Sequence, residues 1–261
     1  MDLGYTLAGF IVGFIVGMTG VGGGSLMTPI LVLLFSVKPA LAVGTDLLYA
    51  SITKGGGIFV HQRNGTIKWQ VVGLLAVGSV PGSVITVGLL QQLTARGLNY
   101  DGVMTTTLGI ALILTSLAIV GKGRLIRFAQ QERFATLRGL HSRYQRPMTM
   151  VAGAILGVLV TLSSVGAGAV GAVMLFFLYP RAPAKQIVGT DLAHAVPLTA
   201  IAGLGHAHLG TVDYDLLAYL LLGSLPGIFI GTNIGIKLPD YVVRPALAGM
   251  LMMIGLRFAV P

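Results

Sequence analysis

Long apolar segments recur along almost the whole chain. Each covers roughly 17 to 25 residues, which is long enough for a helix to cross a hydrocarbon core of roughly 30 Å. The segments lack the alternation of apolar and polar residues found in the strands of outer-membrane barrels. Because backbone groups in lipid must be satisfied within the protein, we expect transmembrane helices. The expected full helices cover about 40–61, 68–92 and 102–121, and then 184–207, 213–236 and 241–258.

Two further apolar segments are interrupted by glycine. Residues 4–35 break at GMTGVGGGS (17–25), and residues 148–179 break at LSSVGAGAVG (162–171). The arms of the first segment have roughly 11 to 16 residues each, which is short for a full crossing. We therefore expect a broken helical hairpin at each place, with the two tips meeting inside the protein.

The chain is predicted to consist of two related halves. Gly44-Thr45-Asp46-Leu47 matches Gly189-Thr190-Asp191-Leu192, and GSVPG at 78–82 matches GSLPG at 223–227, both at an offset of 145 residues. Each half has three full helices and a hairpin that returns to its own side, so the halves enter the membrane from opposite faces. The predicted fold is an all-α polytopic membrane protein with two inverted-topology repeats, each a broken helical hairpin plus three transmembrane helices.

Charge gives the domain boundaries and the orientation. Seven of the 17 Lys and Arg residues lie between Lys122 and Arg146, so we divide the chain into a first repeat (1–121), a basic cytoplasmic loop (122–147) and a second repeat (148–261). With that loop inside, thirteen basic residues fall on the cytoplasmic side and three outside, as the positive-inside rule expects. We therefore predict a multi-pass protein with both termini outside.

Composition agrees with a lipid bilayer as the main partner. Hydrophobic residues make up 54% and charged residues 10%, against roughly 25% charged residues in soluble domains, and the mean hydropathy is +0.87. The net charge of +9 comes largely from the basic loop, so no nucleic-acid partner is expected. The chain has no cysteine, no HExxH and no GxSxG motif, so we expect neither an enzyme nor a cofactor.

The glycine-rich breaks are the predicted substrate site. A broken helix presents free backbone N–H groups at the start of its second piece, and these groups and the helix dipole favour an anion. The alternative is close helix packing without a ligand. The candidate residues are Gly22, Gly23, Gly24, Ser25, Ser163, Ser164, Gly166 and Gly168.

The paired Thr-Asp motifs have two interpretations. An intramembrane carboxylate is costly, which makes Asp46 and Asp191 candidates for coupling to a proton or sodium ion. Thr and Asp after a glycine also suit the first turn of a helix, so the motif could simply cap one. Because an aspartate repels an anion, direct contact with the substrate is expected through Thr45 and Thr190.

Lys54 and the histidines complete the candidate chemistry. Lys54 lies inside a predicted span, where it could contribute positive charge to an anion pathway or extend to the membrane interface. His194, His206 and His208 lack the spacing of a metal site, so we expect interface or loop histidines and no metal.

The motifs also carry a family resemblance. GMTGVGGGSLMTPILVLLF, followed by PALAVGTDL and repeated in weaker form after the polar central region, resembles the sulfite exporter TauE/SafE family, also called TSUP permeases. The resemblance covers nearly the whole chain. It implies transport of sulfite, thiosulfate, sulfonates or similar sulfur-containing anions across the prokaryotic cytoplasmic (inner) membrane.

The resulting functional hypothesis is a secondary transporter with a midplane site between the repeats, working by alternating access. Alternatives on the same architecture are an anion or cation channel, or a carboxylate permease. The sequence leaves open the exact substrate, the direction of transport, the coupling ion and the oligomeric state.

Overall fold

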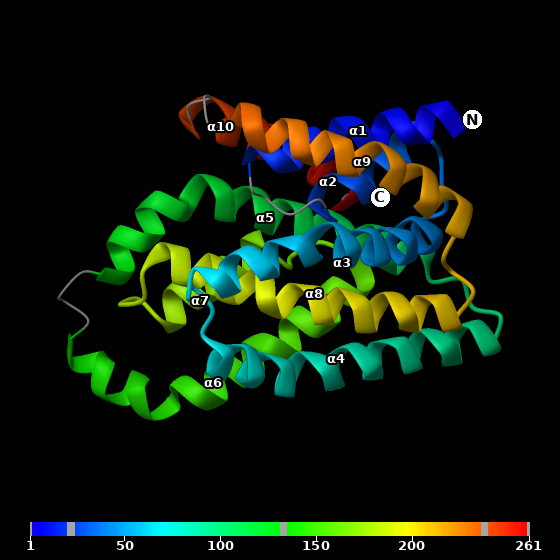
Figure 1. Cartoon of the computed structure of the whole chain (residues 1–261). Coiled ribbons are helices and arrows are strands. Elements are labelled where there is room, and N and C mark those ends of the chain that lie inside the picture. Colours follow the sequence, from blue (N-terminus) through cyan, green and yellow to red (C-terminus); the bar gives the residue numbers. More distant parts are fainter. Residues whose placement is uncertain (1, 20–23, 131–134, 236–239, 260–261) are drawn as a thin grey trace.

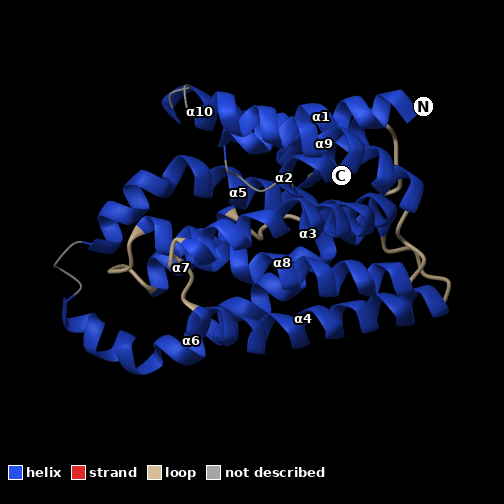
Figure 2. Ribbon diagram, viewed as in Figure 1, coloured by secondary structure: helices blue, strands red, loops and turns tan. Residues whose placement is uncertain are grey.

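The helices expected from the apolar pattern are present. The computed structural model describes residues 2–19, 24–130, 135–235 and 240–259, and these contain α-helices and no strand (Figure 2). The helices are α1 (Asp2–Thr19), α2 (Gly24–Leu34), α3 (Pro39–Arg63), α4 (Trp69–Ala95), α5 (Asp101–Gln130), α6 (Ala135–Ser163), α7 (Ala169–Leu178), α8 (Ala184–His208), α9 (Tyr214–Gly235) and α10 (Asp240–Ala259).

Five of the described helices are long and apolar enough to cross a membrane. They are α4, α8 and parts of α5, α6 and α9, while Leu3–Met18, Ala169–Leu178 and Leu247–Ala259 are shorter apolar helices. Many large apolar side chains, such as Ile85, Leu222 and Phe229, are exposed on the outside of the bundle. Such a surface fits contact with lipid tails rather than water.

The helix α3 is as long as a membrane-spanning helix but is not among these five. Its 25 residues include the buried side chains of Thr45, Asp46 and Lys54. The polarity is tolerated because α3 packs against α8, α2 and α9 inside the bundle. It therefore contributes chemistry to the interior.

The helices of the two halves pack in corresponding pairs. The first helix of each half lies along the fourth helix of the other half, α1 on α9 and α6 on α4. The third helices, α3 and α8, pack on each other, as do the fifth helices, α5 and α10. Two inverted repeats would pack in this reciprocal way. The inverted repeat itself stays a prediction.

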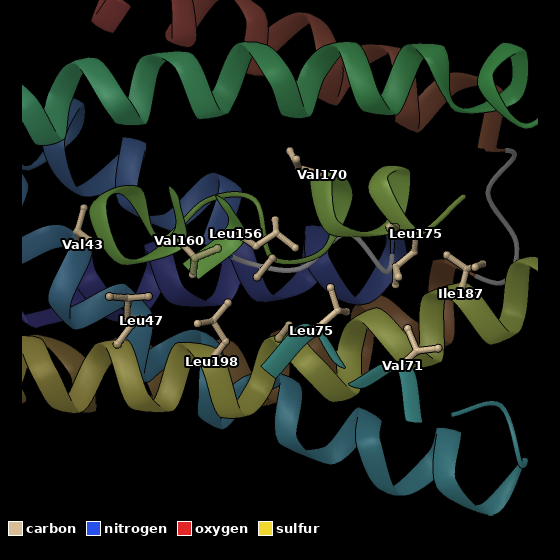
Figure 3. Packing of buried hydrophobic residues seen from close by; sticks show 14 of the residues in the cluster. Val43, Leu47, Val71, Leu75, Leu156, Val160, Val170, Leu175, Ile187 and Leu198 are labelled. Atoms are coloured by element: carbon tan, nitrogen blue, oxygen red, sulfur yellow. The ribbon is translucent and has the colours of Figure 1, made fainter. Parts of the chain in front are cut away.

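One buried apolar cluster joins α3, α4, α6, α7 and α8. Figure 3 shows its side chains converging, among them Leu47 of α3, Leu75 of α4, Leu156 of α6, Leu175 of α7 and Leu198 of α8. A second cluster contains Val12, Leu26 and Met27 of α1 and α2 together with Val165, which lies between α6 and α7. The helix α2 and the interruption in the second half therefore belong to the same apolar cluster.

The expectation of a loop over residues 122–147 was wrong. The basic loop 122–147 is largely helical, because α5 continues to Gln130 and α6 begins at Ala135. Lys, Arg, Gln, Leu and Ala are good helix formers, so both helices extend past the apolar segment, away from the rest of the bundle (Figure 1). The first arm of the second hairpin is correspondingly long, and Tyr144–Ser163 alone suffices to cross a membrane.

Glycines allow the closest helix contacts. A Cβ atom on Gly78 of α4 would lie 2.8 Å from the backbone nitrogen of Ala154 in α6, and one on Gly82 would lie 2.8 Å from the oxygen of the same residue. In the other half, Gly223 and Gly227 of α9 contact the backbone of α1 in the same way. The GxxxG spacings around the helix prolines thus serve close packing.

We predict that Gly78→Ala lowers the thermal unfolding midpoint in detergent. Overpacking against a backbone costs about 1–3 kcal/mol. Gly88→Ala, in the same helix but with nothing within 4 Å of the new Cβ, is the matched control. It should leave the midpoint unchanged or raise it, since alanine exceeds glycine in helix propensity by up to about 1 kcal/mol. Equal midpoints for the two variants would contradict the close contact.

Candidate functional site

The break between α6 and α7 has a backbone that interrupts the helix. Ser164, Gly166 and Gly168 have φ angles of 57°, 113° and 134°, in the left-handed region. Glycine adopts such angles without steric cost, so the sequence VGAG permits the turn. The amide of Ser164 still donates to the Val160 carbonyl, which closes the last turn of α6. The interruption expected here is confirmed.

The short helix α7 begins at the break with amide groups directed back into it. Gly171 donates to the Gly166 carbonyl and Ala172 to the Gly168 carbonyl. The amides of Ala169 and Val170, at the first two positions of α7, have no acceptor within the helix, as at every helix start. These groups and the helix dipole produce a local positive potential inside the protein.

Lys54 extends from α3 to this break. Its side chain is 6% exposed, and Nζ donates a hydrogen bond of 2.9 Å to the carbonyl of Ala167. The two residues are 113 positions apart in the chain. The alternative in which Lys54 extends to the membrane interface was therefore wrong, because the ammonium group is held in the interior by a carbonyl exposed by the break.

Asp46 lies on the same helix and is wholly buried. Its Oδ2 accepts from the Thr28 amide at 3.2 Å and also from the Thr28 hydroxyl. Ser164 of the break faces the same carboxylate. Its Oγ and Asp46 Oδ1 lie outside hydrogen-bonding geometry, and neither atom has another partner among the described residues. A carboxylate thus bridges α3, α2 and the break.

Asp191 occupies the corresponding place in the second half. It is 3% exposed and lies against the first turn of α7, where a Cβ on Gly171 would come within 3.2 Å of its Cγ. Both carboxylates exert an electrostatic attraction on Lys54. The structure therefore brings together one lysine, two aspartates and the start of α7.

The helix-capping interpretation of the Thr-Asp motifs was wrong. Helices α3 and α8 begin at Pro39 and Ala184, so Asp46 and Asp191 lie about two turns inside them. Proline at the first position suits a helix start because its missing N–H would have no partner there. The carboxylates instead lie near the starts of the neighbouring short helices, α2 and α7.

The structure does not bring Thr45 and Thr190 to the breaks. Thr45 Oγ1 accepts from the Asp213 amide at 3.0 Å, and Thr190 Oγ1 accepts from the Lys68 amide at 3.0 Å. Each hydroxyl thus anchors the connection before a fourth helix, α9 or α4, and the two contacts correspond at an offset of 145 residues. The contacts that the two hydroxyls make here are structural, and substrate contact through them stays a prediction.

Other predicted residues have mixed outcomes. Gly22 and Gly23 lie outside the described residues, and so do the surroundings of Gly24 and Ser25, with which α2 begins. Ser163 is buried, and its hydroxyl bonds within the turn to Leu159 and Val165. No group of His, Cys, Asp and Glu that could hold a metal ion occurs in the part of the chain that the structure describes.

The expectation of interface or loop histidines was wrong for two of the three. His194 and His206 are buried, and only His208 is exposed. His194 Nε2 pairs with Ser79 Oγ at 2.8 Å, and His206 pairs with Thr211 Oγ1 at 2.8 Å. These internal contacts follow from the polar inner faces of α8.

Sequence reasoning also missed three internal polar residues, Thr28, Tyr49 and Ser79. The offset of 145 residues could have found one of them, because it equates Tyr49 with His194, and the Tyr49 phenol pairs with Ser224 as His194 pairs with Ser79. The same offset equates His61 with His206, and each ring pairs with a threonine five residues later.

Two surface hollows lie away from this polar site. One has a volume of about 520 Å³ and is lined by residues that include Lys38, Tyr100 and Thr211. The other has about 190 Å³ and is lined by residues that include Lys68 and Thr190. Lys68 precedes the first residue of α4 and Tyr100 follows its last, so the two hollows lie at opposite ends of this helix and of the bundle. Neither hollow is lined by Lys54, Asp46 or the break.

Comparisons with known proteins match nearly the whole chain. A family model described as "Sulfite exporter TauE/SafE" matches residues 5–258. Two proteins of Bacillus subtilis, described as probable membrane transporter proteins YjnA and YdhB, are 37% and 29% identical over 98% and 94% of this chain, covering 99% and 97% of their own lengths. The probable membrane transporter protein MJ0441 of Methanocaldococcus jannaschii is 24% identical over 96% of this chain and 92% of its own length. No solved structure matches.

We predict that Thr45→Val lowers the thermal unfolding midpoint, because the amide of Asp213 loses its acceptor, at a cost of about 1–3 kcal/mol. Thr53→Val is the matched control in the same helix. The Thr53 hydroxyl donates to the Tyr49 carbonyl of its own helix, so its loss leaves no donor unpaired. An equal midpoint for both variants would contradict the anchoring role.

Proposed function

Since the chain belongs to the sulfite exporter TauE/SafE family, we propose that it is a secondary transporter of small sulfur-containing anions such as sulfite, thiosulfate or organosulfonates. The relatives are probable membrane transporters, and this chain is a multi-pass membrane protein of the same family. The nature of the substrate is inferred from the family description together with the chemistry of the site.

The hydrogen bond from Lys54 to Ala167 is the observation that carries the proposal. It places an ammonium group at the start of α7, beside amides that lack helical acceptors. A sulfur oxyanion offers several acceptor oxygens to such donors, and charge-assisted bonds are stronger in a water-poor interior. The predicted site therefore lies between Lys54 and the first turn of α7, with Ser164, Gly166 and Gly168 shaping it.

Alternating access is the proposed mechanism. The polar site is buried, and the two hollows lie towards opposite ends of the bundle. A substrate would enter through one hollow and leave through the other after the helices around the break rearrange. We place the protein in the prokaryotic cytoplasmic membrane, in line with its bacterial and archaeal relatives.

The first experiment measures uptake of labelled anions into proteoliposomes. The panel contains sulfite, thiosulfate, an organosulfonate, a carboxylate and chloride. Saturable uptake of the sulfur anions, stimulated by the same anion on the opposite side, is the expected result. Uptake without saturation would indicate a channel, and preference for the carboxylate would overturn the proposed substrate class.

In the same assay, Lys54→Met should raise the half-saturating concentration about tenfold or more. Loss of a charged hydrogen-bond donor costs about 1.5–3 kcal/mol, which corresponds to such a change. Lys185→Met, which changes an exposed lysine, is the control and should behave as wild type. Unchanged uptake by Lys54→Met, at matched incorporation, would remove the lysine from the anion site.

The proposed orientation has both termini outside and residues 122–147 in the cytoplasm. Asn64 and Asn99 are exposed and lie in the connections at the two ends of α4. Because the chain has no cysteine, single variants can be labelled cleanly. In intact cells an impermeant maleimide should label Asn99→Cys but not Asn64→Cys, and the reverse pattern would invert the topology.

A further inference from the structure

The charge balance of the polar site limits what it can bind. Asp46, Asp191 and Lys54 are 0%, 3% and 6% exposed, and the lysine is attracted by both aspartates. With all three groups ionised, the site carries one net negative charge. An additional anion would leave two or more uncompensated charges in a medium of low dielectric constant, which is prohibitively costly. An anion can therefore enter only with a compensating positive charge.

Asp46 is the group best placed to take that charge. Its Oδ2 already accepts two hydrogen bonds from Thr28, whereas Oδ1 is buried without a partner among the described residues. A protonated carboxyl carries an O–H donor, and the Ser164 hydroxyl facing it can act as acceptor. The two atoms lie outside hydrogen-bonding geometry in this structure, so their pairing requires a side-chain rotation, whereas protonation of Oδ1 by itself removes the charge of a wholly buried group.

The other titratable groups around Asp46 have separate engagements. Two of these groups, Lys54 and Tyr49, lie on the same helix as Asp46. Lys54 donates to the Ala167 carbonyl. The Tyr49 phenol pairs with Ser224. On the helices packed against α3, the buried titratable groups among the described residues are Asp191, His194 and His206, all on α8. Asp191 lies against α7, where helix amides favour a negative charge. His194 pairs with Ser79 of α4. His206 pairs with the Thr161 carbonyl of α6 and with Thr211 in the α8–α9 connection.

We propose that the anion crosses the membrane together with a proton carried by Asp46, so that the protein is an anion–proton symporter. This inference rests on the proposed function. A proton from the aqueous phase binds Asp46 on one side, the anion binds at Lys54 and α7, and both leave on the other side. Sodium is disfavoured because the electrostatic interaction of Asp46 with the Lys54 ammonium group would oppose a second cation at the carboxylate.

The test uses a labelled organosulfonate, whose single negative charge one proton balances, in proteoliposomes containing the full chain. Two rates are measured at zero membrane potential. One is uptake driven by an inward proton gradient, with a dye reporting internal acidification, and the other is exchange of labelled for unlabelled organosulfonate at equal pH. Wild type should show both activities, with acidification during driven uptake. Wild type that accumulates the organosulfonate without acidification, or only with a sodium gradient, would overturn the proposal.

Asp46→Asn removes the proton site and imitates the neutral carboxyl. The variant should retain the exchange activity, and the exchange rate should not depend on pH between about 6 and 8. Its proton-driven accumulation should fall about tenfold or more. Asp215→Asn, which changes an exposed aspartate, should keep both activities. Driven accumulation retained in Asp46→Asn would contradict the proposal. Absence of both activities in wild type, for every anion of the panel, would instead overturn the proposed function.

Thr28→Val provides a second test that leaves the carboxylate in place. It removes one donor to Asp46, so the protonated form is favoured, and the pH of half-maximal driven uptake should rise. A merely structural role for Thr28 would change the amount of folded protein but not this midpoint. An unchanged midpoint would exclude Asp46 as the proton carrier, even if Asp46→Asn does not fold.

Discussion

The need to satisfy every backbone polar group away from water governs this structure. A transmembrane helix meets this need by itself, but a helix interrupted in mid-membrane leaves amides and carbonyls that other parts of the protein must accept. Here Lys54 binds the carbonyl of Ala167, exposed where α6 ends and α7 begins. The surrounding helices keep lipid away from the break, and glycines such as Gly78 and Gly153 let α4 and α6 approach closely enough to do so.

Buried charge follows from the same constraint. A lysine in the interior needs carboxylates nearby, and Asp46 and Asp191 supply them from the inner faces of α3 and α8. Each carboxylate lies beside the start of a short helix, where amide donors stabilise negative charge. The arrangement holds one ammonium group beside the start of α7, where the helix dipole is positive, which is the chemistry an anion requires.

The correspondence between the halves is close but not complete. Thr45 and Thr190, and likewise the pairs of His61 with Thr66 and His206 with Thr211, make matching contacts. Lys54 has no such counterpart, because the matching position is Thr199, whose hydroxyl bonds to its own helix. The structural contacts are thus shared by both halves, whereas the interior cation belongs to one, and this asymmetry selects the break of the second half as the proposed anion site.

The sequence by itself determined the membrane class, the positions of most helices, the glycine break of the second half and the pairing of motifs between halves. These features depend on local apolar length and on residues with special backbone angles, which are properties of short segments. Hydropathy could not show that α5 and α6 extend through 122–147, since it marks where lipid ends rather than where a helix ends. The side chains of Lys54, Asp46 and Thr45 were interpreted with alternatives because a helix position does not reveal which neighbour it faces. Only the tertiary structure decided this, since the partners Ala167, Thr28 and Asp213 come from other elements, brought close by helix packing over separations of 18 to 168 residues.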